Sequence, residues 1–137
     1  MNRYSTYTGV VHSWMCDHFG HMNVRWYAHV FDDAGFVLWP SVGVTREHFV
    51  DAHTVVAKTE TDFRAELLAG QIIGVLSQFT RVGNKSVEYQ QQLIDLETKK
   101  EHATQRVVEV FFDRETRASV PIPTNVRALL ERSVGSR

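Results

Sequence analysis

The apolar positions of this chain follow two different periods. Over residues 24–39 they recur at helical spacing, at Tyr27, Phe31, Ala34 and Leu38. The opposite side of the same segment carries Arg25, His29, Asp32, Asp33 and Phe36. Proline does not continue a helix, and asparagine before the first turn is a good N-cap. The pattern therefore predicts an amphipathic helix over residues 24–39, with Asn23 as its N-cap and Pro40 at its end.

Period-two alternation predicts strands in the rest of the chain. A run that is apolar on both faces, residues 9–16, indicates a first strand that is covered on both sides. Four further strands are expected at residues 53–64, 72–82, 86–96 and 102–113. The Gly83-Asn84 pair is a two-residue hairpin signal, and a charged turn is expected at residues 97–100.

The order of these elements favours an α+β fold. A loop or short helix is expected at residues 45–49, and Thr124 is expected to cap a last helix through residue 133. A chain of 137 residues with 43% apolar content is long enough for one core and too short for two ordinary domains. We therefore predict a single domain, residues 1–137, in which a five-stranded antiparallel sheet packs on one long helix.

Charge and composition disfavour several classes of partner. The 15 Lys and Arg against 16 Asp and Glu give a formal net charge of -1, which supplies no global field for nucleic acid or an anionic membrane. No apolar run reaches the ~20 residues of a membrane span and the N-terminus has no signal-peptide core, so we expect a cytoplasmic protein. The single cysteine, Cys16, cannot form an internal disulfide and is interpreted as a buried strand residue.

The candidate chemistry lies in residues 17–23, DHFGHMN, between the first predicted strand and the long helix. Gly20 lets the backbone approach another group closely, and a helix start offers unpaired N–H groups at the positive end of its dipole. The N–H groups from Gly20 to Val24 could therefore stabilise an oxyanion, with Asp17 a few residues upstream. The segment predicts chemistry on a carbonyl group.

Residues 14–23, WMCDHFGHMN, followed by Tyr27, resemble the signature of the hotdog-fold acyl-CoA thioesterases of the 4-hydroxybenzoyl-CoA thioesterase type. That signature has an aspartate, two residues, Gly-His, an apolar residue and Asn ahead of a helix. The turn at Gly70, the hairpin at residues 81–86 and the C-terminal Pro-then-helix also match the family's arrangement. Val24 stands where the family often has a second Asn, which looks more like the betainyl-CoA thioesterase subgroup.

The resemblance implies hydrolysis of an acyl-CoA to the free acid and CoA. Asp17 would act as nucleophile or as general base, and both roles require it to be ionised. Backbone N–H groups near Gly20 and Val24 would form the oxyanion hole. Asn23 would cap the helix or orient water, and His21 would fix the loop that presents Asp17. No separate cofactor is expected, because coenzyme A is part of the substrate.

Three further sets of residues have candidate binding roles. Arg81, Lys85 and Ser86 around the hairpin are the best local set for CoA, and Phe19, Trp26 and Tyr27 are candidates for the wall of an acyl pocket. Asp32 and Asp33 are candidates for a second carboxylate on the helix, or are solvated charges. The histidines have no matching Cys or paired carboxylate at a known ligand spacing, so no metal site is expected.

A five-stranded sheet on one helix leaves edge strands open, which predicts a homodimer with a continuous sheet. The resemblance adds that the active site lies at the subunit interface and that dimers often pair into tetramers. Two alternatives stay open: a non-catalytic module that binds acyl-CoA or acyl carrier, and a hydratase of related fold that uses Asp17 with His21. The acyl group is not predicted, and aromatic, short, long and cationic groups all remain possible.

Overall fold

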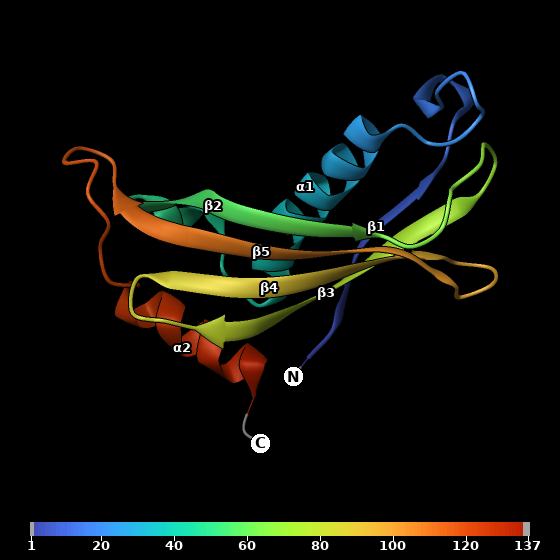
Figure 1. Ribbon diagram of the computed structural model, residues 1–137. Coiled ribbons are helices and arrows are strands. Elements are labelled where there is room, and N and C mark those ends of the chain that lie inside the picture. The colour runs from blue at the N-terminus through green and yellow to red at the C-terminus, as the bar shows by residue number, and fades with distance from the viewer. Residues whose placement is uncertain (1, 136–137) are drawn as a thin grey trace.

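The computed structural model describes residues 2–135. Figure 1 shows five strands and two α-helices. In chain order they are β1 (Tyr4–Val10), α1 (Val24–Ser41), β2 (Ala52–Phe63), β3 (Ile72–Val82), β4 (Ser86–Asp95), β5 (Glu101–Asp113) and α2 (Thr124–Val134). Two short 3-10 helices, η1 (Ser13–Met15) and η2 (Arg46–Phe49), precede and follow α1.

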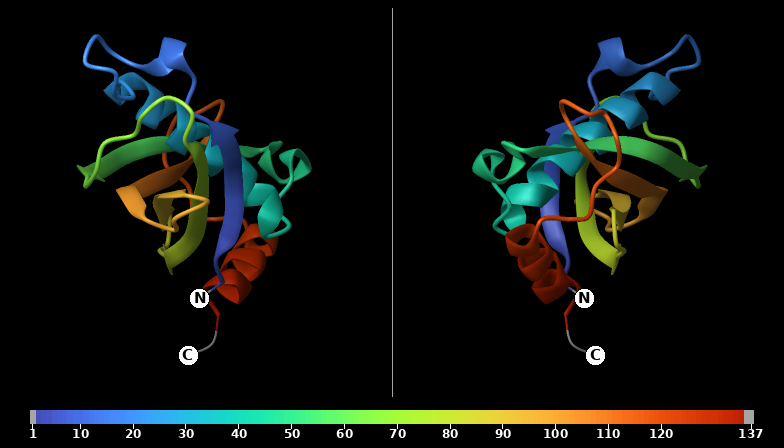
Figure 2. Two further views of the ribbon diagram at one scale, coloured as in Figure 1. Left: turned by 90° about the vertical axis from the view of Figure 1, so that its right-hand side faces the viewer. Right: turned by 90° about the vertical axis from the view of Figure 1, so that its left-hand side faces the viewer.

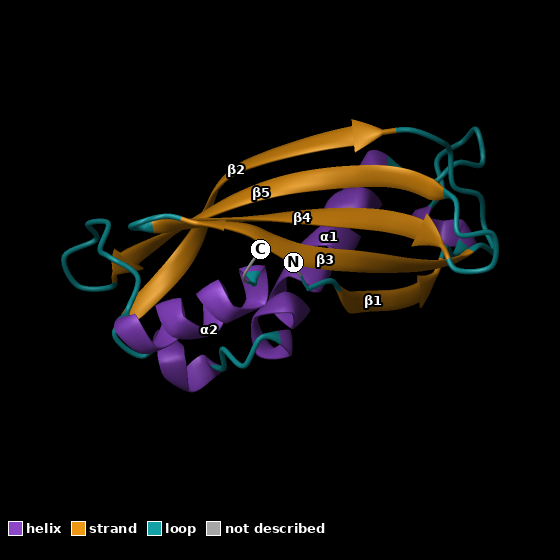
Figure 3. Ribbon diagram, turned by 90° about the horizontal axis from the view of Figure 1, so that it is seen from below, coloured by secondary structure: helices purple, strands orange, loops and turns teal. Residues whose placement is uncertain are grey.

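The strands form one antiparallel sheet in the order β1-β3-β4-β5-β2, which Figure 3 shows from below. The sheet curls around α1, and the two end-on views in Figure 2 show the helix held on its inner side. This is the hotdog arrangement, so the predicted fold class is confirmed. β1 and β2 are the two edge strands of the sheet.

The predicted inner face of α1 is the face that packs on the sheet. Tyr27, Phe31, Ala34 and Leu38 are all buried. They meet the inward side chains of the central strands, such as Phe79 of β3. The Asn23 side chain accepts a hydrogen bond from the Arg25 N–H at 3.1 Å, which confirms the predicted N-cap.

Pro40 does not end α1 at Trp39, because the helix continues to Ser41. The Ser41 hydroxyl donates a hydrogen bond of 2.8 Å to the Val37 carbonyl, which stabilises this last turn. Proline is tolerated there because only its own N–H is missing and the helix has almost finished. The prediction was short by two residues.

The first predicted strand was wrong in its bounds. The strand β1 ends at Val10, and residues 11–16 turn away from the sheet into η1. Val11 and Met15 are apolar because they fold back into the core from this turn. Trp14, by contrast, is exposed to solvent. A turn that buries some of its apolar residues can therefore have the same sequence pattern as a strand that is covered on both faces.

The predicted cap of the last helix was also wrong. Pro123 occupies the N-cap position of α2, and no side chain caps the helix there. Thr124 is instead the first helical residue. The fixed φ of proline presets the backbone for a helix start, so a helix can begin without a capping hydroxyl. Val126 and Leu130 are buried as predicted, and Leu129 is partly buried.

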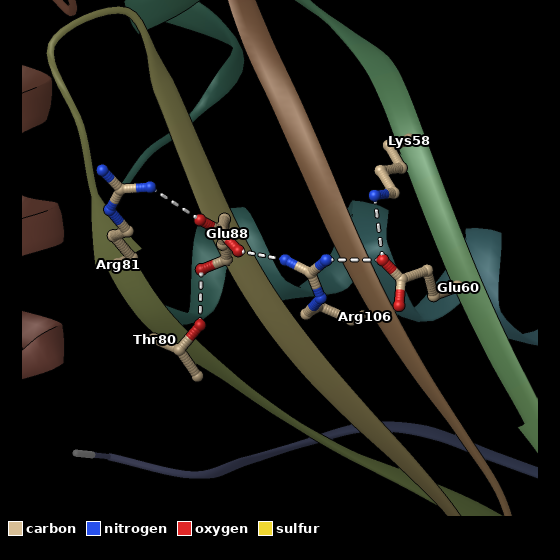
Figure 4. A network of polar contacts seen from close by, with 6 residues as sticks. All are labelled: Lys58, Glu60, Thr80, Arg81, Glu88 and Arg106. Carbon is tan, nitrogen blue, oxygen red and sulfur yellow. Dashed lines mark hydrogen bonds and ion pairs between the residues drawn. The ribbon is translucent and has the colours of Figure 1, made fainter.

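The outer face of the sheet is polar. Figure 4 shows a chain of ion pairs that crosses four strands, from Arg81 through Glu88, Arg106 and Glu60 to Lys58. Alternation along the strands turns these side chains away from the core. Exposed pairs of this kind contribute little individually to the stability of the fold, because water and salt screen them. This face is therefore a solvated surface.

Within residues 2–135, no helix has the length and apolar composition needed to cross a membrane.

Candidate active site

Residues 17–23, the motif loop, lie between η1 and α1 and pack on the connection between β2 and β3 (Figure 1). The Met22 N–H donates to the Leu67 carbonyl at 2.8 Å, and His21 forms an isolated β-bridge with Leu68. A second bridge joins Cys16 and Met22 across the loop. The loop is thus fixed at both ends before α1 begins.

Asp17 is anchored through one of its two carboxylate oxygens. Its Oδ1 accepts hydrogen bonds from the N–H groups of Phe19 at 2.9 Å and His21 at 3.3 Å. Among the residues that the structure describes, no donor contacts Oδ2. Desolvation by itself raises the pKa of Asp17, but these two hydrogen bonds and the nearby imidazoles of His21 and His18 outweigh it and lower the pKa below its ordinary value. Asp17 is therefore ionised at neutral pH, with one oxygen free to react.

The backbone donors of the motif loop are nearly all engaged. The Gly20 N–H donates to the Asp17 carbonyl at 3.0 Å, and the Asn23 N–H donates to the Met15 carbonyl at 2.9 Å. The Val24 N–H, in the first turn of α1, has no acceptor within the described part of the chain. It points from the positive end of the helix dipole. Of the residues predicted for the oxyanion hole, Val24 is the one whose N–H is available.

Gly20 has a different role in this geometry. Its φ is +86°, a left-handed conformation that side chains other than glycine's adopt only with strain. A Cβ at this position would meet no atom within 4 Å, so the conformation rather than the space requires glycine. The residue closes the turn that brings the His21 N–H back to the Asp17 carboxylate.

His21 contacts a residue that sequence reasoning missed. Its Nε2 lies 3.1 Å from Oε2 of Glu66, which belongs to the connection between β2 and β3. The side chain of Glu66 is 69% exposed and that of His21 is 35% exposed. No signal in the sequence links two residues 45 positions apart, because their contact depends on how the connection packs on the motif loop.

The three aromatic residues predicted for the acyl pocket lie in different surroundings. Phe19 is 73% exposed at the tip of the motif loop. Tyr27 is buried and packs edge-on against Phe63, with ring centroids 5.0 Å apart. Trp26 packs against Trp14 and lines a hollow of about 220 Å³ beside β1. Within one chain they do not converge on a single pocket.

The residues predicted for CoA binding lie far from Asp17 within one chain. The hairpin between β3 and β4 stands at one end of the 11-residue strand β3, and the motif loop packs beside the other end, about 35 Å away at ~3.3 Å per residue. Arg81 is paired with Glu88 at 3.1 Å, and the Lys85 Nζ lies 3.5 Å from the Ser119 hydroxyl. A single chain does not bring this set to the motif loop.

A large hollow lies elsewhere, between α1 and the part of the sheet formed by β2, β4 and β5. It has a volume of about 610 Å³ and is lined from Asp32 to Pro40 on α1 and by residues of β2, β4 and β5. A neighbouring groove of about 460 Å³ begins at Arg25 and shares Asp32 and Tyr89 with it. Asp33 does not line either one and lies 3.4 Å from the His29 Nε2.

Metal ligation has no support in this geometry. Within residues 2–135, no three His, Cys, Asp or Glu side chains gather closely enough to hold a metal ion.

Comparisons with solved structures agree with the fold. A 1,4-dihydroxy-2-naphthoyl-CoA thioesterase from Synechocystis is 14% identical with a TM-score of 0.82, over 94% of this chain and 96% of that one. The protein SAV2348 from Staphylococcus aureus, solved in complex with CoA, is 21% identical with a TM-score of 0.85, over 98% and 86%. The PA5185 protein from Pseudomonas aeruginosa is 25% identical with a TM-score of 0.78, over 96% of both chains. No curated protein sequence matches the chain.

The sequence comparison covers the motif loop, the long helix and the whole sheet after them. Residues 10–130 match the family described as the thioesterase-like superfamily, which is most of the 137-residue chain. The match includes Asp17, its turn and the start of α1, a segment that carries an ionised carboxylate and an available helix N–H. The chain therefore belongs to the thioesterase-like superfamily and is a hydrolase that acts on thioester bonds.

Proposed function

We propose that the protein is an acyl-CoA thioesterase that uses Asp17 to release a free acid and CoA. The observation that carries this proposal is the asymmetry of the Asp17 carboxylate. Two backbone N–H groups hold Oδ1, Oδ2 has no donor within the described chain, and the same loop leads into the N-terminus of α1 at Val24. An anchored, ionised carboxylate with one free oxygen suits both nucleophilic attack and general-base catalysis.

The Val24 N–H and the dipole of α1 would stabilise the oxyanion that forms at the thioester carbonyl. In comparable sites, removal of one such donor costs ~3 kcal/mol of transition-state stabilisation. In the nucleophilic route, Oδ2 attacks the carbonyl carbon, the C–S bond breaks and CoA leaves as a thiolate, which takes up a proton. Water then hydrolyses the acyl anhydride. In the general-base route, Oδ2 removes a proton from water, which attacks the same carbon; the C–S bond breaks and the CoA thiolate takes up the proton from Asp17.

The contact between His21 and Glu66 favours hydrolysis over the hydratase alternative. A hydratase would direct the imidazole of His21 and the carboxylate of Asp17 at one substrate carbon. The His21 Nε2 instead lies 3.1 Å from Oε2 of Glu66, in the connection between β2 and β3 on which the motif loop packs. This arrangement supports the role of a positioning residue for His21, and Asn23 acts on the site through the cap of α1.

The open edge of the sheet supports a homodimer. The strand β2 is 12 residues long, lies at the sheet edge and exposes Val55, Val56 and Phe63. A second copy that pairs antiparallel along β2 would continue the sheet and cover this edge. Such pairing reverses the strand direction, so the hairpin end of the second sheet would lie at the motif end of the first. This would resolve the separation between Asp17 and the hairpin residues Arg81, Lys85 and Ser86.

The finer assignments remain predictions. They are the likeness to the 4-hydroxybenzoyl-CoA or betainyl-CoA subgroup, the pairing of dimers into tetramers, and a cytoplasmic location. The acyl group also has to be measured, because the motif loop itself is compatible with aromatic, short, long and cationic acyl groups.

The test is release of free thiol from benzoyl-, acetyl-, decanoyl- and betainyl-CoA by the purified protein and by Asp17→Asn. Asparagine keeps an oxygen at the Oδ1 position, so the turn is retained while the reactive oxygen is lost. We expect turnover of at least one substrate and a fall of ~100-fold or more in the variant. Thiol release that the variant leaves unchanged would contradict the role of Asp17. Binding of CoA esters without any thiol release would favour the non-catalytic module.

A further inference from the structure

The 610 Å³ cavity between α1 and the sheet contains a buried carboxylate that the proposed chemistry does not use. Glu109 lies on β5 between Val107 and Phe111, on the side of the strand that faces the core. Its exposed fraction is only 6%, and it lines the cavity. A carboxylate among inward-facing apolar residues is costly unless a donor or a cation compensates for its lost hydration.

The described residues give Glu109 one strong donor and no cation. The Tyr89 hydroxyl donates a hydrogen bond to the Glu109 carboxylate. Burial, followed by the charges of Glu109 and Asp32, raises the pKa of Tyr89 far above its ordinary value, so the hydroxyl keeps its proton. Within residues 2–135, Glu109 forms no ion pair. A neutral donor alone offsets only part of the cost of a buried charge.

Other lining residues indicate a binding pocket rather than a gap in the packing. Gly35 faces Tyr89, and a Cβ at this position would lie 2.9 Å from the Tyr89 hydroxyl oxygen, so glycine allows that ring to sit where it reaches Glu109. The His53 Nε2 is buried at the same cavity without a hydrogen-bond partner in the described chain.

The charges around the cavity are unbalanced. Asp32 adds a second carboxylate from α1, and Arg46 on η2 is the one Lys or Arg among the lining residues. Arg46 is exposed and forms no ion pair with either carboxylate in the described chain. Three aromatic rings complete the wall, those of Phe36, Trp39 and Phe49, and such rings favour a cation over an anion.

The cavity is continuous with the start of α1. The neighbouring groove begins at Arg25, in the first helical turn, and shares Asp32, Val56 and Tyr89 with the cavity. From Val24 to Gly35 the helix rises about 16 Å at 1.5 Å per residue. An extended alkyl chain of medium length spans most of that distance, and the hydrogen bonds at its two ends account for the rest. An acyl group whose carbonyl meets the Val24 N–H would therefore place its far end at Glu109.

We propose that this cavity binds the ammonium end of an apolar chain, with Glu109 and Asp32 as the anionic partners of the cation. The substrate class is then a medium-length acyl thioester with a basic terminus. This inference rests on the proposed thioesterase function for the position of the carbonyl, but the cation site itself can be measured without catalysis.

The test is calorimetric binding of n-octylammonium and of n-octanol at neutral pH to the purified protein. The two probes share the alkyl chain and differ in charge. We expect n-octylammonium to bind at least tenfold more tightly, which corresponds to about 1.4 kcal/mol. Glu109→Gln should reduce this ratio to about twofold or less. Asp32→Asn should reduce it in part, and it serves as a second variant if Glu109→Gln does not fold. Glu131→Gln, a distant surface variant paired with Arg127, is the matched control.

Equal or tighter binding of n-octanol would overturn the proposal, because the cavity would then show no preference for a cation. A preference for the cation that survives in both Glu109→Gln and Asp32→Asn would overturn it as well. Thiol release from decanoyl-CoA and 10-aminodecanoyl-CoA separates this inference from the proposed function. Hydrolysis without any preference for the basic chain rejects the cation site alone, and cation binding without hydrolysis of either ester rejects the thioesterase alone.

Discussion

Two turns of this protein use the same local chemistry in different surroundings. Asp17 opens the motif loop and Asp95 opens the turn between β4 and β5, and the Oδ1 of each accepts two backbone N–H bonds. The Asp95 Oδ2 accepts a hydrogen bond of 2.8 Å from the Gln71 side-chain amide, and Asp95 is buried. The Asp17 Oδ2 has no donor among the described residues, and α1 begins at the end of the same loop. A turn aspartate becomes a candidate catalyst only where its second oxygen is open and a helix N-terminus lies beside it.

The largest expected effect comes from the same substitution at both turns. Asp17→Asn should lower kcat/KM by ~100-fold or more and lower the melting temperature less than Asp95→Asn does, because asparagine keeps the Oδ1 acceptor and only an open, charged oxygen is lost. Asp95→Asn should leave kcat/KM within about twofold of the native value and lower the melting temperature by roughly 3–6 °C. Thiol-release kinetics and thermal unfolding of both variants test whether one loses mainly activity and the other mainly stability.

The reason for the loss at Asp95 is the orientation of Gln71. In Asp95→Asn the new side-chain amide would face the Gln71 amide, donor against donor. Gln71 cannot reverse without losing the bond of 2.7 Å that its Oε1 accepts from the Leu68 N–H. If both variants lost activity to the same extent, the two turns would be equivalent and the comparison would fail.

The next largest effect is expected at the N-cap of α1, the helix that follows the Asp17 turn. Asn23→Ala removes the cap of α1, and we expect it to lower the free energy of unfolding by about 1 kcal/mol. It should also reduce kcat, because the Val24 N–H loses its fixed direction. Asn23→Asp keeps a capping oxygen and is the matched control. Urea unfolding together with steady-state kinetics tests this, and full activity in Asn23→Ala would argue against Val24 as the oxyanion donor.

A smaller effect is expected at the contact that supports the motif loop. Glu66→Gln weakens its contact with His21, and we expect kcat to fall by roughly two- to fivefold with KM unchanged, because an exposed contact contributes little. Glu131→Gln breaks an exposed pair with Arg127 on α2 and should leave kcat as it is. A change in KM alone would assign Glu66 to substrate binding instead.

The smallest expected effect is a shift in the pH dependence of kcat/KM. The pKa of Asp17 lies below the ordinary aspartate value of about 3.9, so the carboxylate stays ionised down to that pH. The fall in kcat/KM that protonation of Asp17 causes should therefore appear only below about pH 4. A limb near pH 6 that disappears in Asp17→Asn would mean that the pKa is raised.

Folding stability should also fall as the pH is lowered, because the pKa values of Asp17 and Asp95 are both lowered in the folded state. Their contribution is present in full above the unfolded value and is lost as the pH falls through the folded values. Acid unfolding of Asp95→Asn should therefore begin from a lower stability and show a weaker dependence on pH below about 4. Circular dichroism across that range measures it.

Much of the scaffold could be predicted from the chain because it depends on local patterns. The inner face of α1, the Asn23 cap, strand β3 and a hairpin after it follow from spacing and turn chemistry within a few residues, although the expected two-residue turn at Gly83-Asn84 was wrong because the last pair is Val82 with Val87. The errors lay where two structures share one pattern. A turn with two buried residues looked like a strand at residues 11–16, and Pro123 replaced the expected cap at Thr124.

The residues around the site were harder to predict, because their partners are distant in sequence. Glu66 acquires its role from the packing of the connection between β2 and β3 on the motif loop. Glu109 lies in the run VVEVFF, which is apolar on both sides, so its sequence does not reveal that it faces the core. The hairpin residues were grouped with Asp17 on the basis of charge, and the length of β3 separates them.

The sequence by itself determined the elements, the fold class and the placement of an aspartate ahead of a helix start, because periodicity, capping and glycine conformation act over a few residues. The tertiary structure decided which oxygen of Asp17 is free, which N–H remains available and where a buried carboxylate lines a cavity. Those properties depend on contacts between segments that are far apart in the chain, and only the packed sheet and helix bring these segments together.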